Sequence, residues 1–236
     1  MTRTELNAAA SVANSSAAGM LEYPALAPSR TAVVIVDMVQ HQTNPGQGCV
    51  PELAQLGMDT TYYQQRVRQQ VIPNTRRLAS AARAAGAQVV FLRLGAASER
   101  MDEVTPHFQP VLQAWGAWDG TEACAVIPEL APETGDVTLL KGGSGGFTTS
   151  ALDTELRQRG IEHVLYTGVV THACVLLTLA AGFDLGYYGY LVSDATAAFS
   201  PRLHDATEDL VSGFLARVVT TSSMLVQLDS GSEQQG

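Results

Sequence analysis

The stretch TGVVTHACVLLTLAAGFDLG, residues 167–186, joins the end of an apolar β-like run to a turn of small residues and then to a helical pattern. Gly186 closes that helical pattern, and another β-like run begins at residue 188. A strand, a glycine-ended helix and a second strand are typical of a βαβ unit in a parallel sheet. Cys174 lies where the helix begins, so it is either a core thiol or a nucleophile.

The rest of the chain repeats this pattern. Most of its β-rich runs are continuously apolar rather than alternating, which is typical of strands covered on both faces. The six runs are 31–37, 87–93, 136–141, 163–170, 188–194 and 216–221. Helical patterns that end at or beside a glycine lie between them, at 61–85, 151–160 and 173–186. We therefore predict an α/β fold: a three-layer, open, mostly parallel six-stranded sheet flanked by helices.

Length and composition favour a single folded domain. The 236 residues are 46% hydrophobic and 16% charged, which is enough apolar material for a sizeable core. Residues 1–29 contain many Ala, Ser and Asn and no continuous apolar stretch of the kind found in secretory signals, so we expect a flexible lead-in. We predict one domain over 30–228 and a disordered tail over 229–236.

The charge of the chain excludes several classes of partner. The formal net charge is −9 and no basic run occurs, which argues against binding of nucleic acid or of an anionic membrane. No apolar stretch reaches the roughly 18 residues that span a bilayer. Three cysteines are an odd number and do not suggest a disulfide framework, so the expected location is the cytoplasm.

Reactive side chains lie at or just after the carboxyl ends of three predicted strands. Ligands of such sheets bind beyond the carboxyl ends of the strands. Asp37 ends the first run, Lys141 ends the third, and Cys174 follows the fourth in the turn that opens a helix. A thiol at a helix N-terminus beside a lysine is expected to have a lowered pKa. An aspartate can take the thiol proton and return it to a leaving amine. The set is suited to acyl transfer by a cysteine nucleophile.

Each of these residues also has a structural interpretation. Cysteine is among the most often buried residue types. An aspartate at a strand end often caps a turn, and a lysine there is usually a solvated charge. The coincidence of all three at carboxyl ends is what favours a site, and on the residues alone both interpretations stay open.

Several segments in order resemble the isochorismatase-like cysteine hydrolase superfamily. They are AVVIVDM, VIPELAPETGDVTLLK, FTTSALDTELRQRGI, TGVVTHACVLLTLAAGFDLGY and VSDAT, and the resemblance covers about residues 30–225. The superfamily includes nicotinamidases, N-carbamoylsarcosine amidases, biuret hydrolases and ureidoacrylate amidohydrolases. GMDTTYYQQRV, VIPNT and AARAAG look most like the ureidoacrylate group, and the chain also resembles biuret hydrolases and streptothricin hydrolases.

The resemblance implies a Rossmann-like fold and assigns roles to the same three residues. Asp37, Lys141 and Cys174 would form the catalytic triad, with a cis peptide bond between Val169 and Val170. The N–H groups of Val170 and Cys174 would hold the oxyanion. The implied activity is hydrolysis of a C–N bond in a small amide, ureide or cyclic amide through a thioester. Alternatives are a vinyl-ether hydrolase of the isochorismatase type, a non-catalytic metabolite-binding oligomer and a redox sensor.

The chain departs from the family pattern at positions that would bind the substrate. Val39 and then Gln40 stand where a Gln usually comes two residues after the Asp, and His172 replaces the common Asp or Asn before the nucleophile. The run GGSGGF (142–147) lacks the usual bulk or charge after Lys141 and suggests a flexible pocket wall. Candidate substrate contacts are therefore Gln40, His41, Phe147, His172, Trp115 and Trp118.

Some of these contacts also have a structural interpretation, and other groups are expected to play no chemical part. His172 could instead cap the turn or face a subunit interface. Trp115 and Trp118 lie in an irregular excursion over 95–132, as a lid or as satellite core. We expect Cys49 and Cys124 to be inert and Asp194 to be structural.

No cofactor or metal is expected. GGSGGF lacks the GK[ST] ending of a P-loop, and the Asp-x-His pair of metal-dependent relatives is absent after Asp37, with His41 and His107 isolated. The expected partners are a small-molecule amide and water. Relatives suggest a homodimer or a homotetramer.

Overall fold

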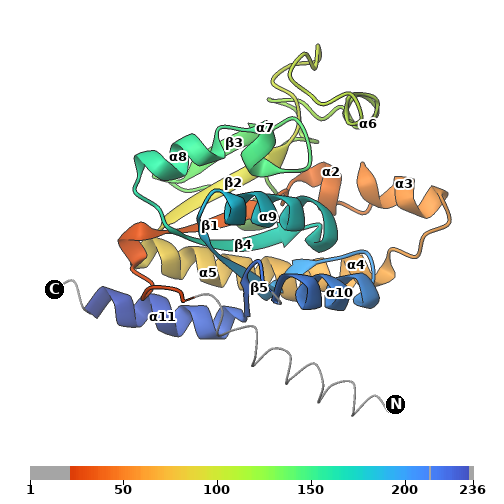
Figure 1. The fold of residues 1–236 in the computed structure, drawn as a ribbon. Helices are drawn as coiled ribbons and strands as arrows, with labels where there is room; N and C mark the ends of the chain where they lie inside the picture. The colour runs from red at the N-terminus through yellow and green to blue at the C-terminus, as the bar shows by residue number, and fades with distance from the viewer. Residues whose placement is uncertain (1–21, 213, 234–236) are drawn as a thin grey trace, which may run out of the picture.

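The computed structural model describes residues 22–212 and 214–233 (Figure 1). Its centre is a six-stranded sheet in the order β3-β2-β1-β4-β5-β6, with every neighbouring pair parallel. The strands are β1 (Thr31–Val36), β2 (Gln88–Leu94), β3 (Val137–Lys141), β4 (His163–Val169), β5 (Tyr188–Ala197) and β6 (Arg217–Val219). The predicted fold class is confirmed, and the sheet is wholly rather than mostly parallel.

The central strands are buried on both faces because their residues are apolar on both faces. Every residue of β1 and of β4 is buried. Alternate residues of β1 point to opposite layers, so Val33 and Ile35 belong to one core cluster while Val34 and Val36 belong to the other. The continuous apolar pattern thus places these strands in the middle of three layers.

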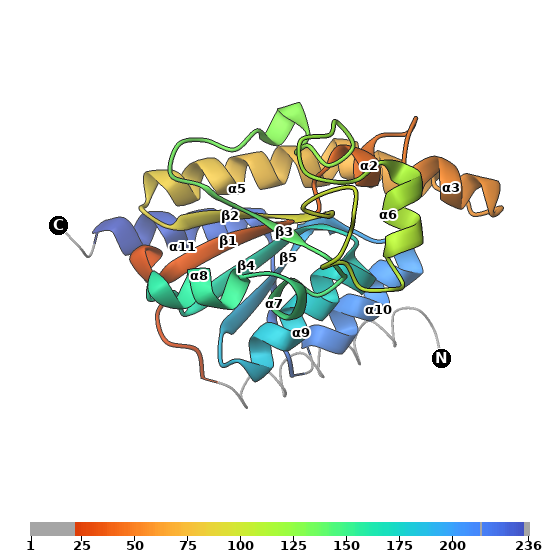
Figure 2. The ribbon, with the colours of Figure 1, turned by 90° about the horizontal axis from the view of Figure 1, so that it is seen from above.

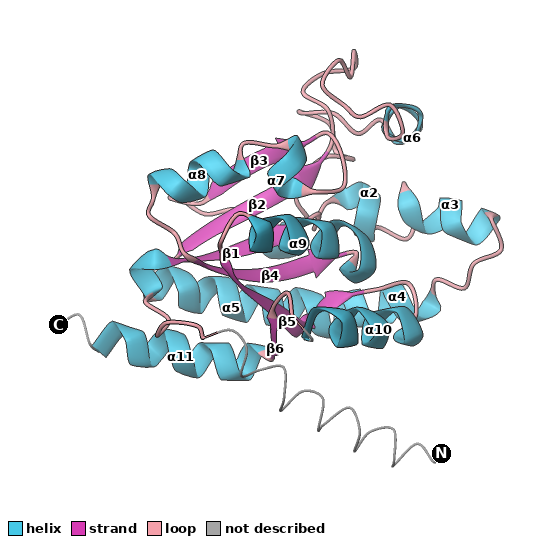
Figure 3. Cartoon of the chain, viewed as in Figure 1, coloured by secondary structure: helices cyan, strands magenta, loops and turns pink. Residues whose placement is uncertain are grey.

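Helices cover both faces of the sheet (Figure 1, Figure 2). Helices α5 (Ile72–Ala84) and α11 (Thr221–Glu233) pack on one face, and α8 (Leu152–Gln158) and α9 (Leu176–Asp184) pack on the other. Helix α10 (Pro201–Ser212) reaches the second layer through Val211. Figure 3 shows the strands lying between these helical layers.

The predicted helix over 61–85 is interrupted. It consists of α4 (Thr61–Arg66), a π-helical segment (Val67–Val71) and α5. Pro73 stands in the first turn of α5 and has no N–H to donate, so the regular α-helical hydrogen bonding is broken just before it. A second π-helical segment (Thr171–Val175) precedes α9 and carries Cys174.

The predicted irregular excursion over 95–132 has a small core of its own. It contains α6 (Gln109–Trp115) and a short 3₁₀ helix (Pro128–Leu130). Leu94, Met101, Val104 and Leu112 are buried together there, and Trp115 and Trp118 pack against them, so the satellite-core interpretation holds for both tryptophans. With α2 (Gln40–Thr43) and α3 (Cys49–Gln55), the excursion lies beyond the carboxyl ends of the strands (Figure 1).

Both ends of the predicted domain extend further than expected. Tyr23 donates its hydroxyl proton to the Gly189 carbonyl (3.1 Å) and packs on Tyr188, so the described fold begins before residue 30. Helix α11 continues past residue 228 to Glu233, with the Ser230 hydroxyl bonded to the Val226 carbonyl. Residues 1–21 of the lead-in and 234–236 of the tail lie outside the described residues. None of the described helices has the length and apolarity needed to cross a bilayer.

Candidate active site

The structure brings Asp37, Lys141 and Cys174 together at the carboxyl edge of the sheet. Lys141 Nζ lies 2.8 Å from Asp37 Oδ2, and the Cys174 thiol is close enough to interact electrostatically with both groups. The strand register explains the meeting, because Val36 pairs with Leu92 and with Gly168, while Leu94 pairs with Lys141. All three side chains are almost completely buried.

Asp37 is held in place by its neighbour strand. Its backbone adopts the left-handed region at φ 52°, which Asp tolerates better than most residues. Its N–H donates to the Leu92 carbonyl (2.9 Å), and its Oδ1 accepts from the Leu94 N–H (2.8 Å). These bonds to β2 leave Oδ2 facing Lys141.

Lys141 is a fully buried cation with two oxygen partners. Its ammonium donates to the Gly143 carbonyl (2.9 Å) and pairs with Asp37. Burial acts to lower the pKa of Lys141, but its interactions with Asp37, and then with Cys174, together outweigh burial, so this pKa is raised overall. The ammonium therefore stays charged at neutral pH.

The Cys174 thiol differs from its predicted state. A lowered pKa was expected, but burial raises the pKa of Cys174 to about 12. Lys141 lowers this pKa by less than burial raises it, and the Asp37 carboxylate raises it further. The resting site thus holds a neutral thiol beside a carboxylate, so a base is needed to make the thiolate.

The turn that presents Cys174 is tightly built. The peptide bond between Val169 and Val170 is cis. The Val170 carbonyl then accepts from the N–H groups of Ala173 (3.0 Å) and Val175 (3.3 Å). Gly168 passes so close to β1 that a Cβ atom there would lie 2.0 Å from the Val36 carbonyl oxygen, so only glycine fits.

His41 and Trp115, predicted substrate contacts, lie together beside this cluster. Their ring centroids are 5.2 Å apart. His41 Nε2 lies 2.8 Å from the Leu94 carbonyl, while its buried Nδ1 has no hydrogen-bond partner among the described residues. Burial lowers the pKa of His41. The charge of Asp37 acts to raise this pKa, and the charge of Lys141 acts to lower it. The Trp115 indole donates to Glu52 Oε2 of α3 (2.6 Å).

Other predicted contacts are placed differently. The Phe147 ring, in α7 (Gly146–Thr149), stacks on Tyr187 at 5.2 Å and packs with the second core cluster rather than lining a pocket. The Gln40 side chain accepts from Asn44 (3.1 Å), and Trp118 packs on the satellite core. His172 lies edge-on to Phe199 at 5.1 Å, with its Nδ1 buried and unpartnered among the described residues, and burial lowers its pKa.

The GGSGGF loop is closely packed rather than a flexible wall. A Cβ atom on Gly142 would lie 2.7 Å from the Glu103 carbonyl, and one on Gly143 would lie 2.9 Å from Thr149 Cγ2. A Cβ atom on Gly146 would lie 2.5 Å from Leu92 Cδ1. The glycines let the loop approach the excursion and the sheet.

The remaining predicted groups have local contacts. Cys49 and Cys124 are buried, and burial raises the pKa of each, to about 12 and about 11. Asp194 accepts from the Thr221 N–H (2.7 Å) and hydroxyl (2.8 Å), which ties β5 to α11. Within the described ranges, no group of three His, Cys, Asp or Glu side chains is arranged to hold a metal ion.

Sequence reasoning missed a polar network behind the nucleophile turn. Arg66, His204 and Glu208 meet there and connect to Thr171. Each is a single polar residue in a helical or turn pattern, so nothing in the sequence distinguished these residues from solvated ones.

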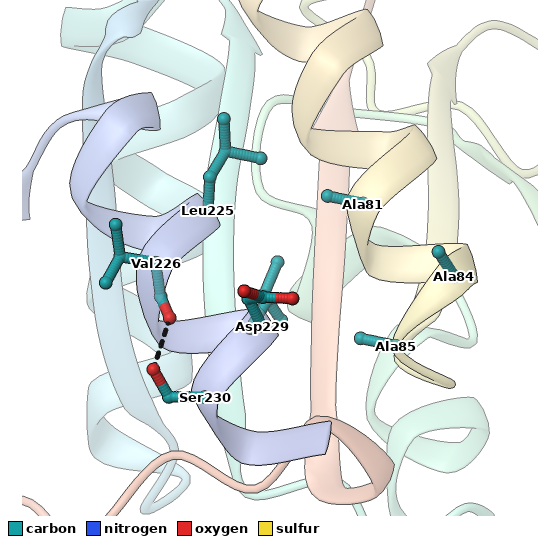
Figure 4. Close-up of a pocket in the computed structure, with 8 residues that line it drawn as sticks. Ala81, Ala84, Ala85, Leu225, Val226, Asp229 and Ser230 are labelled. Atoms are coloured by element: carbon teal, nitrogen blue, oxygen red, sulfur yellow. Dashed lines mark hydrogen bonds between the residues drawn. The ribbon is translucent and has the colours of Figure 1, made fainter. Parts of the chain in front are cut away.

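A groove between α5 and α11 lies away from this site (Figure 4). Ala81, Ala84 and Ala85 line one side, and Leu225 and Val226 line the other. None of the described residues that line the groove carries a thiol, imidazole or ammonium, so they offer none of the chemistry found at the carboxyl edge.

The fold and the three meeting strand ends define the class of protein. Residues 31–223 match the family model described as the isochorismatase domain, and the chain belongs to the isochorismatase family. It is therefore an isochorismatase-family hydrolase.

The chain is also similar to proteins with named activities. The chain is 34% identical over 196 residues to the ureidoacrylate amidohydrolase RutB of Stutzerimonas stutzeri (strain A1501), covering 75% of this chain and 74% of that protein. Among solved structures it resembles a cysteine hydrolase from Pseudomonas syringae pv. phaseolicola 1448A (TM-score 0.73, 24% identity, 89% of this chain and 98% of that one). It also resembles the N-carbamoylsarcosine amidase of Thermoplasma acidophilum (TM-score 0.61, 27% identity, 81% and 96%).

Proposed function

We propose that the protein hydrolyses a C–N bond in a small amide, ureide or cyclic amide through a thioester acyl-enzyme. The observation that carries this proposal is the buried Cys174 thiol beside the paired Asp37 carboxylate and Lys141 ammonium. The names of the relatives support the reaction class, since one acts on ureidoacrylate and another on N-carbamoylsarcosine. A vinyl-ether hydrolase has no need of this nucleophile.

The first half of the reaction makes the thioester. Asp37 takes the proton of the Cys174 thiol as its sulfur attacks the carbonyl carbon. The carbonyl oxygen becomes an oxyanion, held by the N–H groups of Val170 and Cys174. Lys141 stabilises the negative charge. When the C–N bond breaks, Asp37 gives its proton to the departing nitrogen.

The second half regenerates the enzyme. A water molecule gives a proton to Asp37 and its oxygen adds to the thioester carbonyl. The C–S bond then breaks, the acid product leaves, and the sulfur recovers its proton from Asp37. The raised pKa of Cys174 is compatible with this cycle, because Asp37 removes the thiol proton as the sulfur attacks, so no thiolate is needed beforehand.

His41 is the proposed contact for a substrate N–H group. A carbonyl only accepts hydrogen bonds, so His41 Nε2 carries the proton and donates it to Leu94, which leaves Nδ1 as an acceptor. A buried acceptor without a partner costs free energy that a substrate donor would recover. The Trp115 ring, tilted against His41, would cover an adjoining flat amide or ureide.

The test is turnover of ureidoacrylate and N-carbamoylsarcosine. Ammonia release measures the turnover, and the intact mass of the acid-quenched protein detects an acyl adduct. We expect one of the two, or a related amide from a panel of ureides and lactams, to be hydrolysed with a transient acyl adduct on Cys174. Cys174→Ala should abolish turnover and the adduct, while Cys124→Ala retains both. Near-normal turnover by Cys174→Ala would overturn the mechanism.

We also propose that the protein acts in the cytoplasm and assembles as a homodimer or homotetramer. Leu177 of α9 and Leu203 and Leu210 of α10 are more than one-third exposed on neighbouring helices, an arrangement that suits a contact between copies (Figure 2). Light scattering should give a multiple of the chain mass of 25.0 kDa. Leu210→Arg should reduce that multiple, and Leu56→Arg, at the exposed residue just after α3, should not.

A further inference from the structure

The hydroxyl of Thr171 connects the nucleophile turn to helix α10. Thr171 follows the cis peptide bond directly and opens the π-helical segment that carries Cys174. Its Oγ1 lies 3.2 Å from His204 Nδ1, and both side chains are buried. The hydrogen bond holds in either imidazole tautomer, because a hydroxyl both donates and accepts.

Two charged groups face the other side of the His204 ring, where Nε2 accepts from Arg66 in one tautomer or donates to Glu208 in the other. Arg66 Nη2 lies 2.7 Å from His204 Nε2, and Glu208 Oε1 lies 2.9 Å from the same nitrogen. Ser193 donates its hydroxyl to Glu208. The ring therefore has partners at both nitrogens and little freedom to turn.

Arg66 anchors this network to the sheet. Its Nε donates to the Thr196 carbonyl (2.8 Å) and its Nη2 to the Ser193 carbonyl (2.9 Å), both in β5. A continuous path of hydrogen bonds thus runs from α4 and β5 through His204 to Thr171. Such buried networks lose stability when one member is removed, because its partner is left without a hydrogen bond.

None of these residues belongs to the proposed catalytic set, yet Thr171 lies between the two N–H groups that would hold the oxyanion. Val170 immediately precedes Thr171, and Cys174 lies in the same short segment. Transition-state stabilisation by backbone donors depends steeply on their position. A small displacement of this turn would weaken the donors without removing the thiol.

We infer that His204 is a positioning residue that, through the Thr171 hydroxyl and backed by Arg66, holds the oxyanion-binding backbone in register with Cys174. This inference rests on the proposed function. It predicts that removal of the Thr171 hydroxyl impairs reactions that pass through an oxyanion more than reactions of the thiol that form none.

Two reagents separate these effects without a known substrate. p-Nitrophenyl acetate acylates Cys174 through an oxyanion: Asp37 takes the thiol proton, the sulfur attacks the ester carbonyl, the C–S bond forms, and p-nitrophenolate leaves. Iodoacetamide alkylates the sulfur by displacing iodide and forms no oxyanion. We expect Thr171→Val to slow acylation of Cys174 by about tenfold or more, while alkylation changes by less than about twofold. Thr171→Ser keeps the hydroxyl and should restore acylation.

A second pair tests the ring itself. The side-chain nitrogen of Asn overlaps imidazole Nδ1 and that of Gln overlaps Nε2, so His204→Asn can retain the Thr171 bond while His204→Gln cannot. Acylation should be faster in His204→Asn than in His204→Gln. Thr207→Val on α10 removes a hydroxyl that donates to the Leu203 carbonyl of its own helix (2.7 Å) and is the control, with wild-type rates.

The outcomes distinguish the inference from the function on which it rests. Normal acylation of Thr171→Val, or an equal fall in acylation and alkylation, would overturn the positioning role. Absence of an acetyl adduct on Cys174 in the unsubstituted protein, or an equal p-nitrophenolate burst from Cys174→Ala, would overturn the nucleophile and with it both proposals.

Discussion

Asp37 and Lys141 form an ion pair 2.8 Å long although β2 separates the strands that carry them. Both side chains are at most 1% exposed. Removing one member of a buried pair leaves an uncompensated charge, which costs about 3–5 kcal/mol. The pair therefore holds the site together and sets the charge around Cys174.

Asp37→Asn should separate the two roles of the carboxylate. Because Asp37 raises the pKa of Cys174 and Lys141 lowers it, loss of the carboxylate should lower that pKa and shift the pH profile of iodoacetamide alkylation to lower pH. Amide turnover should nevertheless fall by about 100-fold or more, since no group remains to protonate the leaving nitrogen. Asp209→Asn, at an exposed position on α10, is the control. Slower alkylation at neutral pH would contradict the charge arrangement.

Lys141→Met should destabilise the fold by about 3–5 kcal/mol, because the Asp37 carboxylate is left buried without its cation. The measurement is urea unfolding. The double variant with Asp37→Asn removes both charges and should lose less stability than the sum of the two single variants. An additive result would show that the two charges do not stabilise each other in the folded state.

The strand ends were predictable, whereas the state of the groups on them was not. Asp37, Lys141 and Cys174 could be placed at one edge because a parallel sheet aligns the carboxyl ends of its strands. The raised pKa of Cys174 depends on burial by packed side chains, and the extent of that burial cannot be predicted from the sequence alone. Phe147 was misplaced for the same reason, since its direction is set by Tyr187 and Gly182.

Long-range polar contacts were the other gap. Arg66, Thr171 and His204 lie on three different elements, and none stands out in a single sequence. Their meeting follows from how α4 and α10 pack around β5 and the nucleophile turn, and only the three-dimensional structure contains that information.

Gly168→Ala should prevent stable folding, because the added Cβ would lie 2.0 Å from the Val36 carbonyl oxygen between the two central strands. The backbone at Gly168 also has φ +96°, a conformation that is strained for a residue with a side chain. Gly160→Ala is a matched control: its φ is +66° but nothing lies within 4 Å of the added atom, so the cost should be about 1 kcal/mol. The check is soluble yield and the thermal midpoint. Equal losses for both variants would show that backbone strain alone, not the close approach of β1 and β4, requires glycine at 168.

His163 should make the fold sensitive to acid. Burial, with further contributions from Arg30 and Arg217, lowers the pKa of His163 to about 4 from an ordinary value near 6.5. The unfolded chain thus binds a proton at this position more readily than the folded chain does. The stabilisation is fully present above about pH 6.5 and is lost as the pH falls from there towards 4. His163 Nδ1 lies 3.3 Å from the Tyr190 hydroxyl, so His163→Asn keeps a polar partner for that hydroxyl without the titrating group. The thermal midpoint of the unsubstituted protein should fall across this range more steeply than that of His163→Asn. Parallel pH profiles for the two proteins would assign the acid sensitivity to other groups.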